Sequence, residues 1–414
     1  MTQQTFAFIL GRESKLSLAE LCNLYGSNKL ITWTEHFAIF SLSHFSQTDL
    51  MHLGWSLRVI RILEEGISSE HFTSQILLTI KESKHEGKYT FALANYGIQL
   101  PIFDMGMRIK KMLLGEGISA RLVNHENTNI HSAVFKKEKL AKQGGEFCFL
   151  QTPQIGYFGI TIAAQDIDDY SRRDTTKERD MIVGMLPPKL AQMMINLSRK
   201  NSEDLPWIYD PFCGLGTVLI EAANMNILSI LGSDINPDMV TATQNNINSY
   251  IETEKVWYDR ITKSGGTPKK NIHHLKSEIF LMDATEIEIS MGSENLRGHN
   301  IVSEWYLGDI MHPRSITIDK VQKERRKLAT MYRKFFVWLK NLHFTGDICM
   351  TFPFWDIAGK YSFFSEIHDI LSELWYKTIP LLPEDEELTT KKWTLLYKRP
   401  GQTVWREVWH GRLR

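Results

Sequence analysis

Short apolar runs alternate with longer segments of helical pattern between residues 207 and 308, and this alternation limits the possible folds more than any other feature. The strand-like runs are "WIYDPF", "ILSILGSDIN", "SEIFLMDAT" and "NIVSEWYLG", and the helical segments are "GTVLIEAANM" and "PDMVTATQNNINSY". Such β-α alternation predicts a parallel, doubly wound sheet. Near the end of the chain, two further strand-like runs flank "RPGQ", which is a hairpin signal. We therefore expect an α/β domain whose parallel sheet is closed by an antiparallel hairpin.

The stretch "DPFCGLGT", residues 210–217, follows the first predicted strand and opens the first predicted helix. Gly214 and Gly216 would permit a tight turn and a close approach of the backbone to a ligand. The pattern is neither the full G-x-G-x-x-G dinucleotide motif nor a phosphate loop with Lys-Ser/Thr. A purely structural strand-to-helix turn remains an alternative.

Three acidic residues fall at the ends of three successive predicted strands. Asp234 lies about 20 residues beyond the glycines, where a carboxylate accepts hydrogen bonds from the ribose hydroxyls of a nucleoside cofactor. Asp283 is placed to meet an adenine amino group, and Asp210 could hold a cationic amino acid portion that a pyrophosphate ligand would not offer. Together they point to S-adenosylmethionine as the cofactor, although each alone could cap a helix or pair with a lysine.

A further helix is predicted earlier in the chain, over "KLAQMMINLSRK". Prolines precede that helix, and proline suits a first helical turn. Cys213 is expected to serve through packing or its backbone, because the sequence shows no base to activate its thiol.

With 414 residues the chain is long enough for two or three domains. Strand and helix patterns, including a predicted helix over "TDLMHLGWSLRVIRIL", end near "EEGISSE", and a second small unit with strand-like "SAVFKKEKLAKQGGEFCFLQT" follows. A polar, charged segment then leads into the last domain. The predicted domains are residues 1–65, 66–165 and 189–414, with a linker at 166–188.

Lys plus Arg equals Asp plus Glu at 48 each, so any attraction to nucleic acid must come from local patches. Clustered cations of the second unit and of the linker are candidate phosphate contacts, although lysines usually form a solvated face. The candidates are Lys110, Lys111, Lys136, Lys137, Lys139, Lys142, Arg172, Arg173, Lys177 and Arg179.

The four cysteines lie far apart without the paired spacing of a metal site. The polar start "MTQQ" is no apolar signal segment, and no window approaches the roughly 20 apolar residues of a membrane helix. We expect a cytoplasmic protein with no metal and no membrane association.

"DPFCGLGTVLIEA", "GSDINPDMV" and the upstream "GMLPPKLAQMMINLSR" resemble the THUMP-domain methyltransferases that modify N2 of a guanosine in tRNA. The resemblance implies a Rossmann-like class I methyltransferase domain over 189–414, a ferredoxin-like domain over 1–65 and an RNA-binding THUMP domain over 66–165. It also implies S-adenosylmethionine as methyl donor, tRNA as substrate and an N2-methylguanosine product. The cofactor contacts that follow from the motifs and from this resemblance are Asp210, Phe212, Cys213, Gly214, Gly216, Thr217, Asp234, Ile235, Asp283, Ala284 and Pro187. Any partner subunit, and the choice between mono- and dimethylation, stays open.

The loop after the fourth strand departs from this family, which carries Asp-Pro-Pro-Tyr or the same motif with Asn or Ser first. Here the loop is "SEWYLG", and two registers are possible. Either Glu304 replaces the Asp, with Trp305 and Tyr306 in place of both prolines, or Ser303 is the oxygen acceptor and Tyr306 the stacking ring. Ser303 or Glu304 would be the oxygen acceptor and Trp305 or Tyr306 the stacking surface for the base, unless the two aromatic residues only pack the edge of the sheet. The candidate catalytic residues are therefore Glu304, Ser303, Trp305 and Tyr306.

Two rival functions fit the same sequence. One is an RNA-binding protein that retains the cofactor pocket without catalysis, which cofactor binding without turnover would reveal. The other is an amine methyltransferase acting on ribosomal RNA or DNA, which shares the catalytic fold but not the lysine-bearing unit at 66–165.

Overall fold

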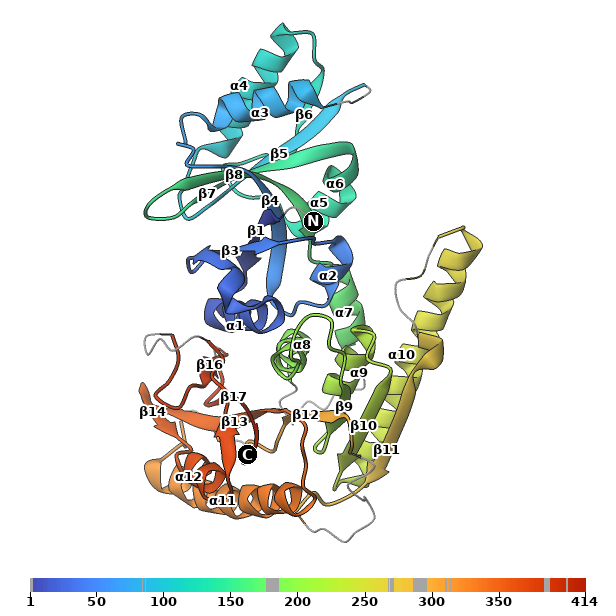
Figure 1. Ribbon diagram of the computed structural model, residues 1–414, viewed down its shortest axis with the longest axis vertical. Helices are drawn as coiled ribbons and strands as arrows, with labels where there is room; N and C mark the ends of the chain where they lie inside the picture. The colour runs from blue at the N-terminus through green and yellow to red at the C-terminus, as the bar shows by residue number, and fades with distance from the viewer. Residues whose placement is uncertain are drawn as a thin grey trace. The chain divides into compact units, whose positions relative to one another are not determined.

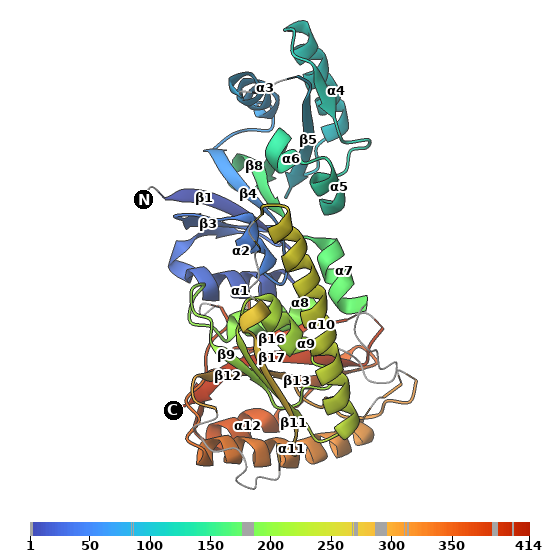
Figure 2. The ribbon, with the colours of Figure 1, turned by 90° about the vertical axis from the view of Figure 1, so that its right-hand side faces the viewer.

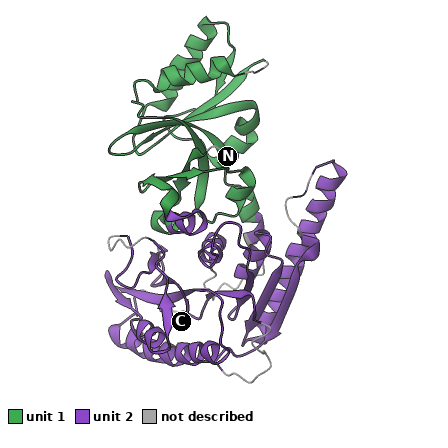
Figure 3. Cartoon of the chain, viewed as in Figure 1, with its two compact units in different colours: residues 1–18, 28–171 green, residues 19–27, 172–414 purple. Residues whose placement is uncertain are grey.

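The computed structural model describes two compact units of the chain (Figure 1). Unit 1 comprises residues 1–18 and 28–171, and unit 2 comprises residues 19–27 and 172–414 (Figure 3). The described residues are 3–83, 85, 87–175, 186–266, 268, 272–285, 296–309, 311–312, 314–382, 388–399 and 401–414.

Unit 1 is built on one mixed sheet of eight strands in the order β2-β3-β1-β4-β8-β7-β5-β6. Strand β4 pairs with both β1 and β8, so the sheet runs on through the boundary predicted at residue 65. A division of this unit into two domains stays a prediction. The strands are β1 (Gln4–Leu10), β2 (Leu30–Trp33), β3 (Phe37–Leu42), β4 (Ser56–Glu65), β5 (Tyr89–Tyr96), β6 (Ala120–Leu122), β7 (Gly144–Gln151) and β8 (Gly156–Ala164).

The helix predicted over residues 48–63 is wrong in its second half. Helix α2 ends at Met51, and β4 begins at Ser56. Val59 and Ile60 are β-branched and fully buried, and the strand has hydrogen-bonded neighbours on both sides. Tertiary pairing therefore overrides the local apolar spacing that suggested a helix. The converse error lies at 132–143, where two short helices replace the predicted strand.

The helices of unit 1 cover both faces of its sheet. Ile102 and Ile109 of α4 share an apolar cluster with Phe91 of β5, whereas Phe135 of α5 packs with Ala92 of the same strand. Because neighbouring residues of a strand point to opposite faces, α4 and α5 lie on opposite faces. The helices that lie wholly in unit 1 are α2 (Gln47–Met51), α3 (Phe72–Glu82), α4 (Ile102–Gly115), α5 (Ser132–Lys137) and α6 (Leu140–Gln143), and α1 (Ser14–Tyr25) and α7 (Ile167–Thr175) have residues in both units.

Unit 2 carries a second mixed sheet, with a main path in the order β11-β10-β9-β12-β13-β17-β15. Its first five strands in sequence are parallel, and β17 is inserted antiparallel between β13 and β15. The predicted alternation and the hairpin of β16 with β17 are confirmed. The strands are β9 (Trp207–Asp210), β10 (Ser229–Asp234), β11 (Lys276–Leu281), β12 (His299–Glu304), β13 (Ile348–Ile357), β14 (Lys360–Phe363), β15 (Tyr376–Thr378), β16 (Leu395–Tyr397) and β17 (Val404–Leu413).

Helices cover both faces of this sheet as well, with α11 and α12 on one side and α8 and α9 on the other (Figures 1 and 2). The side of α11 holds a large aromatic core, in which Tyr332 and Phe335 pack against Trp355 and Trp409. Across the described residues, no helix is both long and apolar enough to cross a membrane. The helices are α8 (Pro188–Leu197), α9 (Thr217–Asn224), α10 (Pro237–Lys263), α11 (Ile318–Asn341) and α12 (Glu366–Glu373).

Candidate active site

The carboxyl ends of the parallel strands of unit 2 bring the predicted acidic residues to one edge of the sheet. Asp210, Asp234 and Glu304 are the last residues of β9, β10 and β12, and Asp283 follows β11. In open α/β sheets ligands bind outside this edge. The predicted grouping of strand-end carboxylates is therefore a feature of the structure.

Two side chains of α10 form hydrogen bonds to the glycine turn between β9 and α9. Thr243 donates its hydroxyl hydrogen to the carbonyl of Gly214, and Asn246 donates its side-chain amide to the carbonyl of Leu215 at 3.0 Å. Gly214 and Gly216 have φ angles of +50° and +78°, which favour glycine. A Cβ atom on Gly216 would lie 2.9 Å from Thr243, whereas one on Gly214 would meet open space. The two supporting residues of α10 were not predicted, because nothing local marks them.

Asp234 is bound to this turn. Its Oδ2 accepts the backbone N–H of Gly214 at 3.0 Å, and its Oδ1 accepts that of Asn236 at 2.9 Å. Since each carboxylate oxygen has a further lone pair, the group can still accept two hydroxyl hydrogens. The next residue, Ile235, leaves 65% of its surface exposed, which is unusual for an apolar side chain.

The other predicted cofactor contacts differ in accessibility. Oδ1 of Asp283 accepts both the backbone N–H and the hydroxyl of Thr285, at 2.7 and 2.8 Å. Phe212 is partly buried and Pro187 caps the start of α8. Cys213, Thr217 and Ala284 are buried and can reach a ligand only through their backbones or small rearrangements.

Asp210 is buried with Ser303, contrary to the expectation that it reaches a cationic ligand. The Ser303 hydroxyl donates to Asp210 Oδ1 at 2.6 Å, and the N–H of Phe212 donates to the same atom at 3.2 Å. Burial raises the pKa of Asp210 to about 7, although both hydrogen bonds oppose the shift. Ser303 is fully buried as well. The pair joins the ends of β9 and β12 and leaves neither side chain exposed to a substrate.

Replacing Asp210 with Asn is expected to change how stability depends on pH. The folded-state pKa is raised above the ordinary 3.8, so the native state binds more protons and the free energy of unfolding falls as pH rises from about 4 to about 7. The amplitude from this one group is about 4 kcal/mol at most. Urea unfolding of Asp210→Asn between pH 4 and 8 should show a flatter profile than wild type, and parallel profiles would contradict the assignment.

Trp305 is part of the core and not a surface for a nucleobase, which corrects one of the predicted roles. Its ring is 1% exposed and stacks on Phe212, with centroids 4.1 Å apart and planes at 16°. Tyr332 lies on it as well, with ring centroids 3.9 Å apart. The adjacent Tyr306 is 39% exposed, donates its hydroxyl to Asp309 and has the Lys327 ammonium 5.0 Å from its ring centre.

Glu304 is held by Arg406 of β17 in a two-pronged ion pair. Nε of Arg406 donates to Oε1 of Glu304, and a terminal nitrogen donates to Oε2 at 3.2 Å. Such fork geometry fixes the orientation of a carboxylate as well as binding it. Arg406 is itself buried, with its charged group 5.8 Å from the ring centre of Tyr397 and a further bond to Gln402. No local sequence pattern marks this partner, which is far from Glu304 along the chain.

The candidate RNA contacts do not form one patch. Lys110 and Lys111 belong to α4, whereas Lys136, Lys137, Lys139 and Lys142 belong to α5, α6 and the turn between them, on the opposite face of β5. All six are exposed. The six lysines therefore lie on two faces of the sheet, and a role in phosphate contact stays a prediction.

The arginines of the predicted linker are engaged in ion pairs within unit 2. Arg173 is buried and donates to Glu221 at 3.0 Å, which removes it from any phosphate. Arg172 binds Glu254 at 2.8 Å and is partly exposed. Lys177 and Arg179 lie outside the described residues.

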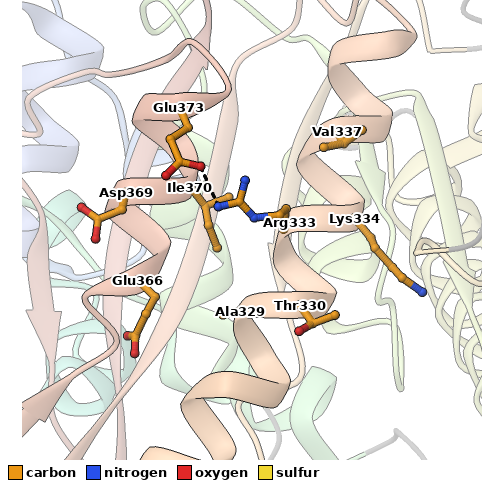
Figure 4. Close-up of a pocket in the computed structure, with 9 residues that line it drawn as sticks. All are labelled: Ala329, Thr330, Arg333, Lys334, Val337, Glu366, Asp369, Ile370 and Glu373. Atoms are coloured by element: carbon orange, nitrogen blue, oxygen red, sulfur yellow. Dashed lines mark hydrogen bonds and ion pairs between the residues drawn. The ribbon is translucent and has the colours of Figure 1, made fainter.

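An open hollow between α11 and α12 lies apart from these strand ends (Figure 4). Arg333 and Glu373 form an ion pair across it at 2.6 Å, and Lys334 lines it. None of the strand-end residues borders it. In the described ranges, no group of three or more His, Cys, Asp or Glu side chains is arranged to hold a metal ion.

The strand order, the glycine turn and the strand-end carboxylates define a class I methyltransferase fold. Residues 176–263 match the family described as RMKL-like, methyltransferase domain (UPF0020). This part of the chain is similar to the methyltransferase domain of that family.

The relatives with curated names match the chain over short segments. A protein of Methanothermobacter thermautotrophicus, tRNA (guanine(10)-N2)-dimethyltransferase, is 45% identical over 71 residues, which is 17% of this chain and 20% of that protein. A probable enzyme of the same name from Methanothermococcus thermolithotrophicus is 47% identical over 68 residues, 16% of this chain and 40% of that sequence. The chain thus matches less than half of the length of either relative.

The fold as a whole also has a solved counterpart. The crystal structure of TrmN from Thermus thermophilus aligns with 99% of this chain and 100% of its own, with a TM-score of 0.50 and 11% sequence identity. At this identity the likeness concerns the fold alone.

Proposed function

We propose that this protein transfers a methyl group from S-adenosylmethionine to the exocyclic N2 amine of a guanosine in tRNA. The observation that carries the proposal is the glycine turn with Asp234 bound to it. The turn lies inside the segment that matches the methyltransferase family. The relatives that share segments of about this length are named for guanine-N2 dimethylation of tRNA, which supports the choice of substrate.

The residues present suit S-adenosylmethionine. Open space in front of Gly214 admits a ligand close to the backbone, and Asp234 retains lone pairs for two ribose hydroxyls. The exposed apolar surfaces of Ile235 and Leu281 flank these strand ends and offer faces for a purine ring. Asp283 supplies an acceptor for an exocyclic amine. When bound, S-adenosylmethionine would supply an electrophilic methyl group on its sulfonium.

Glu304 is the acceptor that we assign to the guanosine amine. An exocyclic amine is a weak nucleophile because its lone pair is delocalised into the ring, so the protein must orient it. The two N–H donors of Arg406 take one lone pair from each Glu304 oxygen and leave another on each. Glu304 can therefore accept an amine proton in a hydrogen bond and hold the lone pair in line. Catalysis of this kind is mostly positioning with electrostatic support.

Ser303 and Tyr306 have different parts in this proposal. The Ser303 hydroxyl is already hydrogen-bonded to Asp210. We therefore prefer the register in which Glu304 takes the place of the Asp that begins the family's motif. Tyr306 keeps an exposed ring beside Glu304, with Lys327 near its face, and can stack on a base that has left its helical stack. The loop thereby retains an acceptor and an aromatic surface without prolines.

We assign the RNA-holding role to unit 1, with the ferredoxin-like part at residues 1–65 and the THUMP part at 66–165. The exposed lysines of α4 and those of α5 and α6 provide two cationic regions, on separate faces, for phosphate contacts.

An assay with unmodified tRNA and labelled S-adenosylmethionine, followed by nucleoside analysis, tests the proposal. We expect N2-methylguanosine from the wild type. Asp234→Ala should weaken cofactor binding by at least tenfold in calorimetry, because it removes the ribose acceptor and the anchor of the Gly214 turn. Cofactor binding without turnover would favour an RNA-binding protein, and methylation of only ribosomal RNA or DNA would favour the other rival.

A further inference from the structure

The hairpin of β13 and β14 extends beyond the end of the catalytic strand. The last paired residues of β12 and β13 are Glu304 and Thr351, and β13 continues from Phe352 to Ile357. Since the two strands are parallel, this extension runs past the carboxyl end of β12, beside the loop that follows Glu304. Strand β14 pairs with β13 alone among the described strands, so it is an addition to the seven-stranded path.

Aromatic rings gather on this extension. Tyr361 and Phe363 of β14 are 46% and 36% exposed. The Tyr361 ring contacts that of Trp405 with centroids 5.3 Å apart, and Phe363 stacks on Phe354 at 5.2 Å. Exposed rings at this density are unusual on a surface, where apolar groups normally scatter singly. We call Tyr361, Phe363 and Trp405, together with Lys398, the aromatic platform.

Lys398 gives the platform a positive charge. Its Nζ lies 4.5 Å from the ring centre of Tyr361 and 5.4 Å from that of Trp405, and it donates to the Tyr361 hydroxyl at 3.3 Å. The exposed Lys360 and Arg399 are chain neighbours of Tyr361 and Lys398. Aromatic faces combined with cations bind single-stranded nucleic acid, because bases stack on the rings while the cations meet the phosphates.

The platform lies at the same end of the sheet as Glu304 but on the opposite face. Arg406, which holds Glu304, and Trp405 are neighbours in β17, and neighbouring residues of a strand point to opposite faces. The turn before β17 contacts the chain beyond the catalytic loop, since the Thr403 hydroxyl donates to the carbonyl of Met311. An RNA strand that crosses this end of the sheet could therefore place one nucleotide at Glu304 and a flanking nucleotide on these rings.

We propose that the aromatic platform stacks on a nucleotide that flanks the target guanosine. This inference rests on the proposed function, because it presupposes an RNA strand at the catalytic edge. When a base leaves a duplex, its neighbours lose their stacking contacts with it. The rings of the platform would replace this lost stacking for one neighbouring base. The platform sets affinity for the RNA, while Glu304 acts on the amine.

The test compares full-length Tyr361→Ala and Phe363→Ala with a matched control, Trp375→Ala. Trp375 is 62% exposed and precedes β15, whose residue Tyr376 pairs with Leu413 at the opposite edge of the sheet. Binding of unmodified tRNA is measured by fluorescence anisotropy, and methylation is measured over a range of RNA concentrations up to saturation. Stacking on one base is worth about 1–3 kcal/mol by alanine substitution, so we expect Kd and KM to rise about tenfold or more in Tyr361→Ala. The kcat value and cofactor binding should stay at the wild-type level.

Tyr361→Phe keeps the ring and should bind within about threefold of wild type, which separates stacking from the hydroxyl bond to Lys398. Urea unfolding checks that the alanine variants are folded. If Tyr361→Ala and Phe363→Ala both bind tRNA as Trp375→Ala does while the wild type methylates it, the platform is overturned and the proposed function stands. A wild type that neither binds nor methylates tRNA overturns both. A platform variant that changes the association state instead of RNA affinity would identify a contact between copies and overturn the inference.

Discussion

Glu304→Gln should lower kcat for methyl transfer by about a hundredfold or more while cofactor affinity stays within twofold of wild type. Glutamine has nearly the same volume, but it replaces one acceptor oxygen with an N–H donor. The fork of Arg406 needs two acceptors, so it competes for the single oxygen that remains. Removing one preorganised polar contact to the reacting group typically costs two to three orders of magnitude in kcat. Single-turnover kinetics at saturating tRNA measure the change.

Arg406→Lys tests the ion pair of Glu304 and Arg406 from the side of the arginine. Lysine keeps the charge but not the fork, so the carboxylate stays in place with a less defined orientation. We expect a kcat between that of the wild type and that of Glu304→Gln, with little change in KM for tRNA. Glu324→Gln is the matched control, because Glu324 is a buried acid that bonds to the same loop through the N–H of Asp309. Equal activity of Glu304→Gln and Glu324→Gln would remove Glu304 from the catalytic assignment.

Trp305→Ala should reduce the free energy of unfolding by about 3–5 kcal/mol, the usual cost of truncating a buried tryptophan. The substitution leaves a cavity between Phe212, which stacks on the indole, and Tyr332, whose ring packs against it at a tilt of 36°. Because Phe212 adjoins the glycine turn, cofactor affinity should fall as well. Urea unfolding followed by fluorescence and circular dichroism measures the first effect, and calorimetry measures the second.

Two further variants serve as controls for this prediction. Tyr306→Ala changes the adjacent, exposed ring and should cost less than about 1 kcal/mol. Trp305→Phe keeps an aromatic ring in the stack and should recover most of the stability. If Trp305→Ala unfolds at the same urea concentration as Tyr306→Ala, the indole does not stabilise the loop.

Local patterns predicted the position of the glycine turn and of its acidic neighbour, whereas their role in cofactor binding stays a prediction. A tight turn from strand to helix can require positive φ angles, which glycine adopts without strain. A carboxylate at the end of a strand follows from the β-α alternation, so Gly214, Gly216 and Asp234 could be placed from sequence. The sequence pattern does not separate helix from strand where burial in the sheet determines the secondary structure. Strand β4 is an example, because a short apolar run does not reveal its central position in the sheet.

The catalytic side depends on contacts between distant parts of the chain. Ser303 bonds to Asp210 and Glu304 bonds to Arg406, and only the assembled sheet brings these residues together. Trp305 looked like a candidate for base stacking because aromatic residues at a site edge often stack, but its neighbours on α11 bury it. The lysines of residues 110–142 were grouped by sequence distance, and the alternation of β5 separates them.

The position of Arg406 on β17 has a consequence for the order in which the protein matures. Chains emerge from the ribosome from the N-terminus onward, so the strands that carry the glycine turn are available long before residues 404–413. Glu304 has no guanidinium beside it until β17 has inserted between β13 and β15. A nascent chain would thus be able to form its nucleoside pocket before it could orient an amine, and cofactor binding would precede catalytic competence during synthesis.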